Sequence, residues 1–176
     1  MATINGRWLG KYRIPSARAT WWNYSQGGCY FVTICTQDRQ HFFGVCQSGE
    51  LRLSESGEIA HSNWLSMQTQ FPFAEMGKYV VMPNHLHGII YLRTPEKEIL
   101  PVGSEKLTLP PNSLGAIVRA FKAKTSTQIR KTGITSFQWQ SGYWDRILTT
   151  DEQIHHVENY IDNNPQKWEH DLFFIR

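Results

Sequence analysis

The sequence predicts an α+β fold of the ferredoxin-like type, in which an antiparallel sheet packs against helices and one further helix follows at the C-terminal end. Segments rich in β-branched and aromatic residues alternate with longer segments of helical periodicity, in the order strand, helix, strand, strand, helix, strand, helix. The first six elements follow the βαββαβ pattern, which RRM-like modules also use. The length of 176 residues is sufficient for one such domain with its own core.

The first strand is predicted at residues 30–36 (YFVTICT), where β-branched and aromatic residues dominate. Residues 39–49 are expected to form a turn-rich excursion, and residues 51–53 a short strand. A helix is predicted at residues 56–70, because its apolar residues recur at helical spacing, and Pro72 lies just beyond its end.

A hairpin is predicted in the middle of the sheet. Its strands are residues 77–82 (GKYVVM) and 85–92 (HLHGIIYL), and Pro83-Asn84 between them is typical of a turn. Residues 93–112 contain four prolines and little apolar content, so we expect a long loop there.

The second half of the domain is predicted to contain a helix, a strand and a last helix. The helix covers residues 114–131, with an apolar stripe on one face. The strand covers residues 143–148 (YWDRIL). The last helix extends from 151 to about 164, with Thr150 as its N-cap and Pro165 preventing its continuation.

The domain itself is expected to span residues 29–168. Residues 1–28 interleave basic and aromatic side chains and are interpreted as an arm, which either contacts nucleic acid or forms a strap over the core. Residues 169–176 are interpreted as a C-terminal tail, either irregular or with one final helical turn.

Composition restricts the class of protein. The net charge of +3 is mildly basic, which agrees with a polyanionic partner without requiring one. The three cysteines include no C-x-x-C pair, so neither a disulfide framework nor a structural zinc site is expected. The N-terminus has no apolar signal region and no window approaches the length of a membrane span, so we expect a cytoplasmic protein with no membrane partner.

Two histidines form the first half of a candidate site. His85 and His87 are two residues apart on a predicted strand, so their side chains point to the same face. Two adjacent imidazoles can bind one metal ion. The same spacing would also suit histidines that are solvated or hydrogen-bonded within the core, and the pattern alone leaves both interpretations open.

The second half of the candidate site lies on the last helix. Tyr160 and Asn164 are four residues apart and share one helical face. The amide oxygen of Asn164 suits magnesium or manganese as a third ligand, and the phenol of Tyr160 can attack phosphorus as a nucleophile. His156 lies one turn before Tyr160 and is a candidate proton shuttle. Alternatively, Tyr160 only packs its ring on the sheet.

Several motifs together resemble one family. The segment VVMPNHLHGII at residues 80–90 resembles the HUH motif (His, hydrophobic, His) of single-tyrosine transposases. The segment at residues 151–168 contains Y-I-x-x-N-P and resembles the end of the catalytic domain of REP-associated tyrosine transposases. Residues 30–44 and 139–148 are also similar to that family, and the resemblance covers about residues 12–168.

The resemblance implies both a fold and a reaction. The expected fold is a small antiparallel sheet with helices on one side. His85 and His87 would hold a divalent metal, Mg²⁺ or Mn²⁺, with Asn164 as third ligand. Tyr160 would attack a phosphodiester of single-stranded DNA at hairpin-forming palindromic repeats, giving a 5′-phosphotyrosine intermediate and a free 3′-OH. The protein would thus be a single-stranded DNA endonuclease and strand transferase, and we favour a monomer over a homodimer.

Contacts with DNA are expected from basic residues on three predicted elements, although those on the helix also suit a simple solvated face. These residues are Arg13 and Arg18 of the arm, Arg119, Lys122 and Lys124 of the helix at 114–131, and Arg146 of the last strand. Three rival functions stay open: a replication initiator or relaxase-type HUH nuclease, a non-catalytic RRM-like nucleic-acid-binding module, and a metal-dependent hydrolase in which Tyr160 only packs.

Overall fold

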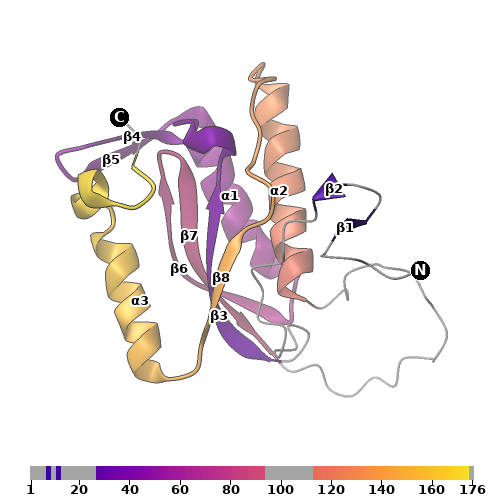
Figure 1. Ribbon diagram of the computed structural model, residues 1–176, viewed down its shortest axis with the longest axis vertical. Helices are drawn as coiled ribbons and strands as arrows, with labels where there is room; N and C mark the ends of the chain where they lie inside the picture. The colour runs from indigo at the N-terminus through magenta and orange to yellow at the C-terminus, as the bar shows by residue number, and fades with distance from the viewer. Residues whose placement is uncertain (1–6, 9–10, 13–26, 94–112, 175–176) are drawn as a thin grey trace.

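The computed structural model describes residues 7–8, 11–12, 27–93 and 113–174 (Figure 1). In the N-terminal region, β1 (Arg7–Trp8) pairs with β2 (Lys11–Tyr12) as an antiparallel ladder. The predicted arm residues Arg13 and Arg18, and almost all of the predicted loop at 93–112, lie outside the described residues.

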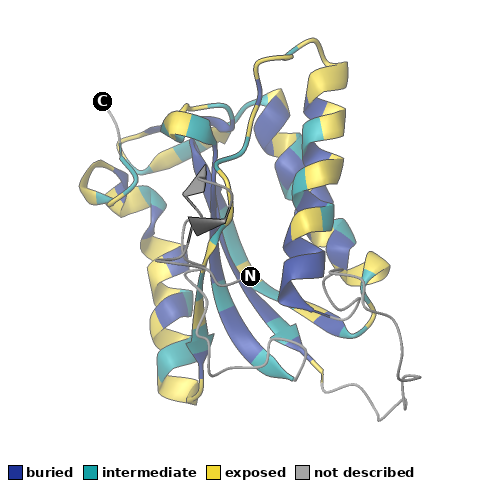
Figure 2. Ribbon diagram, turned by 45° about the vertical axis from the view of Figure 1, so that its right-hand side comes forward, coloured by how far each residue is buried: buried dark blue, intermediate teal, exposed yellow. Residues whose placement is uncertain are grey.

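The centre of the fold is a four-stranded antiparallel sheet. It consists of β3 (Gly28–Cys35), β6 (Ala74–Met82), β7 (His85–Leu92) and β8 (Trp144–Leu148), in the order β6-β7-β3-β8. This order and the βαββαβ succession confirm the predicted ferredoxin-like fold. β7 and β3 are the inner strands, and most of their residues are buried, as the dark colouring in Figure 2 shows.

Helices cover both faces of this sheet. α1 (Glu55–Gln70) and α2 (Leu114–Lys131) pack side by side on one face, over the larger apolar core, while α3 (Asp151–Asn163) packs on the opposite face (Figure 1). The expectation of helices on one side only was therefore wrong. The reason is that α3 has its own apolar stripe, with Val157 and Ile161 buried against the sheet.

Each α-helix begins at a side-chain cap, and the cap of α3 is the predicted Thr150. Ser54 accepts from the Gly57 amide at the start of α1, and Thr150 accepts from the Gln153 amide at 3.3 Å at the start of α3. Ser113 caps α2 in the same way. These caps fix the chain direction at each entry to a helix, so the predicted and observed helix boundaries nearly coincide.

The segment between β3 and α1 differs from its prediction. After the short 3₁₀ helix η1 (Gln37–Arg39), the expected turn-rich excursion contains β4 (Gly44–Gln47), which pairs with β5 (Glu50–Leu53) as a hairpin. The turn uses Ser48 and Gly49 at positive φ, 52° and 80°. After α3, residues Pro165–His170 form a second 3₁₀ helix, η2. Within the described residues no helix is both long and apolar enough to cross a membrane.

Alternation along the inner strands gives each face of the sheet its own chemistry. Tyr30, Val32 and Ile34 are fully buried in the core beneath α1 and α2. On that face Gly88 of β7 lies directly against the indole of Trp64, and a Cβ at position 88 would be 2.3 Å from Trp64 Cζ2. The absence of a side chain at Gly88 is thus a packing requirement of the α1 face.

We predict that Gly88→Ala destabilises the protein, because the added methyl group must displace a rigid, fully buried ring. The expected loss is about 1–3 kcal/mol in the free energy of unfolding, measured by urea denaturation. A Trp64→Phe background should reduce this loss, since the smaller ring leaves room for the methyl group. An equal loss in both backgrounds would show that the Trp64 contact is not the cause.

Candidate active site

His85 and His87 lie next to each other on β7, on the face of the sheet that α3 covers. Their ring centroids are 4.4 Å apart and both side chains are almost completely buried. The register with β3 places His85 opposite Cys35 and His87 opposite Thr33. The prediction that strand spacing brings the two imidazoles together is therefore confirmed, while their function stays a prediction.

The orientation of His85 is fixed by its neighbour Asn84. The Asn84 amide nitrogen donates to the carbonyl oxygens of Arg39 and Phe173, at 3.1 and 2.8 Å, so its oxygen points to the histidine. That oxygen accepts from His85 Nδ1 at 2.8 Å. The proton therefore resides on Nδ1, and Nε2 presents a lone pair. Within the part of the chain that the structure describes, this buried Nε2 has no hydrogen-bond partner.

His87 connects the sheet to the last helix. Its Nδ1 lies 2.8 Å from Thr33 Oγ1 and its Nε2 lies 3.1 Å from the hydroxyl oxygen of Tyr160. The Thr33 hydroxyl can either donate to or accept from Nδ1; in the Nδ1–H tautomer, Nε2 presents a lone pair that a metal could bind. The ring of Phe31 stacks on His87 at 5.2 Å and restricts its rotation.

Tyr160 projects from α3 toward the histidine pair. Its hydroxyl donates its single hydrogen to Asp171 Oδ2 at 3.1 Å, and its ring meets Phe31 edge-on at 6.1 Å. Burial raises the pKa of Tyr160 well above its usual value of 10.0, and the negative charge of Asp171 raises it further. The phenol is therefore protonated at neutral pH.

Asp171 is the residue that the sequence analysis missed. Its Oδ2 accepts from Asn164 Nδ2 at 2.7 Å as well as from Tyr160, and its Oδ1 accepts from the Phe173 amide. The ligand atoms of His85, His87 and Asp171 all lie within 4.8 Å of one another. Asp171 belongs to the segment expected to be a tail, and no periodicity or motif in the sequence distinguishes it.

Asn164, the predicted third ligand, lies at the same place. Its side chain is buried at the end of α3, and its amide nitrogen is directed at Asp171. Its Oδ1 is a buried oxygen for which none of the described residues supplies a hydrogen-bond donor. The Asp171 carboxylate therefore lies beside the two imidazoles, and the buried Asn164 side chain is hydrogen-bonded to it.

The donor set fits a divalent cation. Burial lowers the pKa of His85 well below 6.5, and His87 and Arg39 lower it further. Burial also lowers the pKa of His87 from 6.5 to about 4, although the Asp171 charge opposes the shift. Both imidazoles are thus neutral at pH 7, which is the form that binds metals. One cation would satisfy both the buried His85 Nε2, which has no partner among the described residues, and the Asp171 carboxylate.

The C-terminal segment covers the histidines. The Phe173 ring lies 4.8 Å from that of His85 and 5.7 Å from that of His87. Arg39 holds this segment, because it donates to the Leu172 carbonyl at 3.0 Å and its guanidinium lies 5.2 Å from the Phe173 ring. Arg39 and Asp38 adopt φ of 54° and 51°, a strained left-handed conformation that directs Arg39 toward the C-terminal segment.

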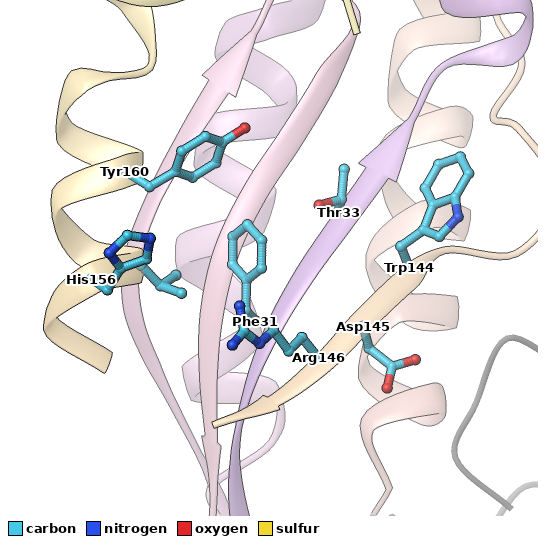
Figure 3. A pocket seen from close by; sticks show the side chains of 8 residues that line it. Phe31, Thr33, Trp144, Asp145, Arg146, His156 and Tyr160 are labelled. Carbon is cyan, nitrogen blue, oxygen red and sulfur yellow. The ribbon is translucent and has the colours of Figure 1, made fainter. Parts of the chain in front are cut away.

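Other predicted site residues surround the site at greater distance. His156 is exposed and lines a pocket together with Tyr160 and Arg146 (Figure 3). The hydroxyl of Tyr160, however, lies within hydrogen-bond distance of His87 and Asp171. The proton-shuttle role of His156 therefore stays a prediction without a contact in the described structure to support it.

The basic residues of α2 lie on the face of the sheet opposite Tyr160. Lys122 Nζ donates to the carbonyls of Gln140 and Gly142 at 2.6 and 2.8 Å, and burial lowers its pKa to about 8. Lys124 Nζ donates to Ser66 Oγ at 2.8 Å, whereas Arg119 is exposed. DNA contacts by these three residues stay predictions, as do those of the undescribed Arg13 and Arg18.

Comparisons with known proteins identify two relatives that are similar in sequence to this chain. No protein-family profile matches the chain. The chain is 32% identical over 172 residues to an uncharacterised protein of Haemophilus influenzae, an alignment that covers 94% of this chain and 96% of the relative. A second Haemophilus influenzae protein, provisionally named a REP-associated tyrosine transposase, is 25% identical over 145 residues, which are 82% of this chain and 74% of the relative.

A solved structure shares the fold. It is that of a REP-associated tyrosine transposase bound to a REP hairpin, and it superimposes with a TM-score of 0.60 at 18% identity. The match covers 86% of this chain and 74% of that one. The α+β architecture with its central antiparallel sheet is therefore common to both.

We predict that Mn²⁺ stabilises this protein through the histidine site. A ligand that binds only the folded state, at a hundredfold excess over its Kd, adds about 2.7 kcal/mol, which a thermal melt detects as a rise in Tm. His85→Ala should abolish the rise, and Asp171→Asn and Asn164→Ala should each reduce it. His155→Ala, which changes an exposed histidine of α3, is the matched control. An undiminished rise in His85→Ala would exclude the site.

We also predict that stability falls as pH decreases from 6.5 toward about 4. The folded-state pKa of His87 lies below its unfolded value, so the unfolded state binds more protons in this interval and is favoured by acid. The stability difference that His87 causes between the acid end and pH 6.5 or above is roughly 3 kcal/mol. Urea denaturation across this range should show a shallower pH dependence for His87→Gln than for wild type, whereas His155→Gln should follow wild type.

Proposed function

We propose that this chain is a REP-associated tyrosine transposase, and that it cleaves and rejoins single-stranded DNA with Tyr160 as the nucleophile. The observation that carries the proposal is the position of the Tyr160 hydroxyl. It lies 3.1 Å from His87 Nε2 and 3.1 Å from Asp171 Oδ2, at the edge of the candidate metal site. A packing tyrosine would need neither contact.

The proposed step is a transesterification. The phenol oxygen of Tyr160 forms a bond to phosphorus, and the bond from phosphorus to the 3′ oxygen of the preceding nucleotide breaks. The products are a 5′-phosphotyrosine and a strand that ends in a 3′-OH once its oxygen has taken up a proton. The number of phosphodiester bonds is conserved, so the reverse step with another 3′-OH rejoins DNA without an external energy source.

Asp171 is in place to accept the proton that the phenol must lose. Tyr160 already donates to its Oδ2, and Asn164 Nδ2 holds the same oxygen from the other side. The pKa of the phenol is raised in the free protein, so proton transfer has to accompany bond formation to phosphorus. His87, which lies equally close to the hydroxyl, fixes its direction.

His85 and His87, with oxygens of Asp171 and Asn164, would hold the divalent metal. When bound, such an ion polarises phosphate oxygens and offsets the charge that develops on them. The protein contributes the orientation of the ligands, since Asn84 and Thr33 fix the two imidazoles from behind. The ion is Mg²⁺ or Mn²⁺ on the chemistry of a mixed imidazole and oxygen site.

Hairpin-forming palindromic repeats are the proposed substrate class. The structural relative was solved bound to a REP hairpin, and this supports the same class of ligand here. Within such a substrate the reactive phosphodiester would lie in an unpaired segment, where Tyr160 can reach it without opening a duplex.

We predict that the purified protein, Mn²⁺ and a single-stranded oligonucleotide carrying an inverted repeat from beside its gene give a covalent DNA–protein adduct. The adduct should survive denaturing gel electrophoresis, and mass spectrometry should place it on Tyr160. Tyr160→Phe should give no adduct, because it removes the attacking oxygen and leaves the ring. His85→Ala should lower adduct formation at least about 100-fold, since the reacting centre loses an electrostatic contact.

Binding of the same oligonucleotide, measured by fluorescence anisotropy, is the control. Tyr160→Phe and His85→Ala should bind within a few-fold of wild type. Binding by wild type with no adduct would favour an RRM-like binding module and contradict the proposal. An adduct that persists in Tyr160→Phe would assign the nucleophile to another residue.

A further inference from the structure

A pocket of about 320 Å³ opens beside Tyr160, between α3 and strands β3 and β8 (Figure 3). This volume is at the lower end of those that hold small ligands. Its lining residues are Phe31, Thr33, Trp144, Asp145, Arg146, His156, Val157 and Tyr160. We call it the Trp144 pocket, after its most exposed aromatic ring.

The walls of the Trp144 pocket are suited to a flat, partly polar ring. Phe31 and Val157 supply apolar surface, and Trp144 is 42% exposed although it is a large aromatic residue. Arg146 and His156 are exposed at the same opening. An aromatic ring with an exposed face and a nearby guanidinium is the combination that binds nucleobases by stacking and their backbone by charge.

The position of the pocket connects it to the reaction. Tyr160 forms one of its walls, while the hydroxyl of the same residue reaches His87 on the other side. β8 is an outer strand of the sheet, so the pocket lies at a margin where a DNA strand can approach. A nucleotide whose phosphate lies at the Tyr160 hydroxyl would therefore have its base, or that of its neighbour, at the mouth of the pocket.

We propose that the Trp144 pocket holds one unpaired base that flanks the phosphodiester attacked by Tyr160, with Trp144 stacking on the base and Arg146 contacting the adjoining backbone. This inference rests on the proposed function and gives it a specificity determinant. A base in the pocket would align its own phosphodiester with Tyr160 and so select the cut position within an unpaired segment.

Trp144 also contacts the segment that covers the histidines, because its ring lies 5.8 Å from that of Phe173. A substitution of Trp144 could therefore act by displacing Asp171 rather than by removing a stacking partner. The test needs a readout that depends on an individual base, since displacement of the C-terminal segment would affect every substrate alike.

The experiment measures binding rather than cleavage. The cut position is first mapped from the adduct formed by wild type, and oligonucleotides are then made with one base at a time around it replaced by an abasic site. Binding is measured by anisotropy with Tyr160→Phe as the parent protein, which cannot cleave. One position should show a loss of affinity of about tenfold or more, the scale of one base stacked on an aromatic ring.

Trp144→Ala, added to the parent, should bind the intact oligonucleotide about tenfold more weakly and lose the penalty for the abasic site at that position. Trp144→Phe should retain most of the penalty, because it keeps an aromatic face. Arg146→Gln should weaken binding to all oligonucleotides, and more at low salt than at high salt. An abasic penalty of the same size in Trp144→Ala and its parent would overturn the proposal.

Matched substitutions on the α1 and α2 side control for surface changes. Leu65→Ala removes an exposed apolar side chain from α1, and Lys131→Gln removes one exposed positive charge from α2. Both should bind as the parent does and keep the abasic penalty. A loss in Lys131→Gln equal to that in Arg146→Gln would mean that Arg146 contributes only net charge.

A second measurement needs no substitution of Trp144. 2-Aminopurine placed at the sensitive position should lose fluorescence on binding, as a base does when it stacks on an aromatic ring, and unchanged fluorescence would count against the pocket. Failure here is distinguishable from failure of the proposed function. An adduct on Tyr160 with no base-specific effect rejects only the Trp144 pocket, whereas the absence of any adduct rejects the reaction itself.

Discussion

The pairing register between β3 and β7 is the constraint on which the rest of the structure depends. With His87 opposite Thr33 and His85 opposite Cys35, both imidazoles point to the α3 face, where Tyr160 can meet them. A slip of one residue would move both histidines into the apolar core beneath α1 and α2. The opposite face resists such a slip, because Trp64 packs on the bare backbone of Gly88 and a side chain there would collide with it.

The candidate site contains buried polar atoms whose burial lowers the free energy of unfolding. His85 Nε2 and Asn164 Oδ1 are buried acceptors without hydrogen-bond partners among the described residues, and each such group costs about 1–3 kcal/mol. The surrounding bonds offset this cost: Asn84 joins the carbonyls of Arg39 and Phe173 to His85, and so connects three distant parts of the chain. Local rules of folding are typically violated at functional sites, and here the violation is two buried acceptor atoms without hydrogen-bond partners among the described residues.

The sequence predicts the features that depend on local residue spacing. It does not predict contacts between parts of the chain that are distant in sequence. Strand alternation places His85 beside His87, and helical spacing places Asn164 on the face of Tyr160. The elements of the sheet follow from the same periodicities. Asp171 could not be predicted, because its position depends on the turn through η2 and on Arg39, whose left-handed conformation no periodicity reveals. The place of α3 on the second face was missed for a similar reason, since an amphipathic stripe does not specify which side of a sheet it covers.

The arrangement around Tyr160 has an electrostatic consequence for the proposed reaction. In the free protein the Asp171 carboxylate disfavours the phenolate, and the hydrogen bond from Tyr160 to Asp171 further stabilises the protonated form. A cation beside His85 and Asp171 would reverse the sign of that local field, since a positive charge near a phenol lowers its pKa. The Asp171 carboxylate, which raises the pKa of Tyr160 in the free protein, would thus also help to bind the cation that lowers this pKa. The nucleophilicity of Tyr160 would then depend on whether a cation occupies the site. Asp171 of the C-terminal segment would thus control the reactivity of a residue on α3.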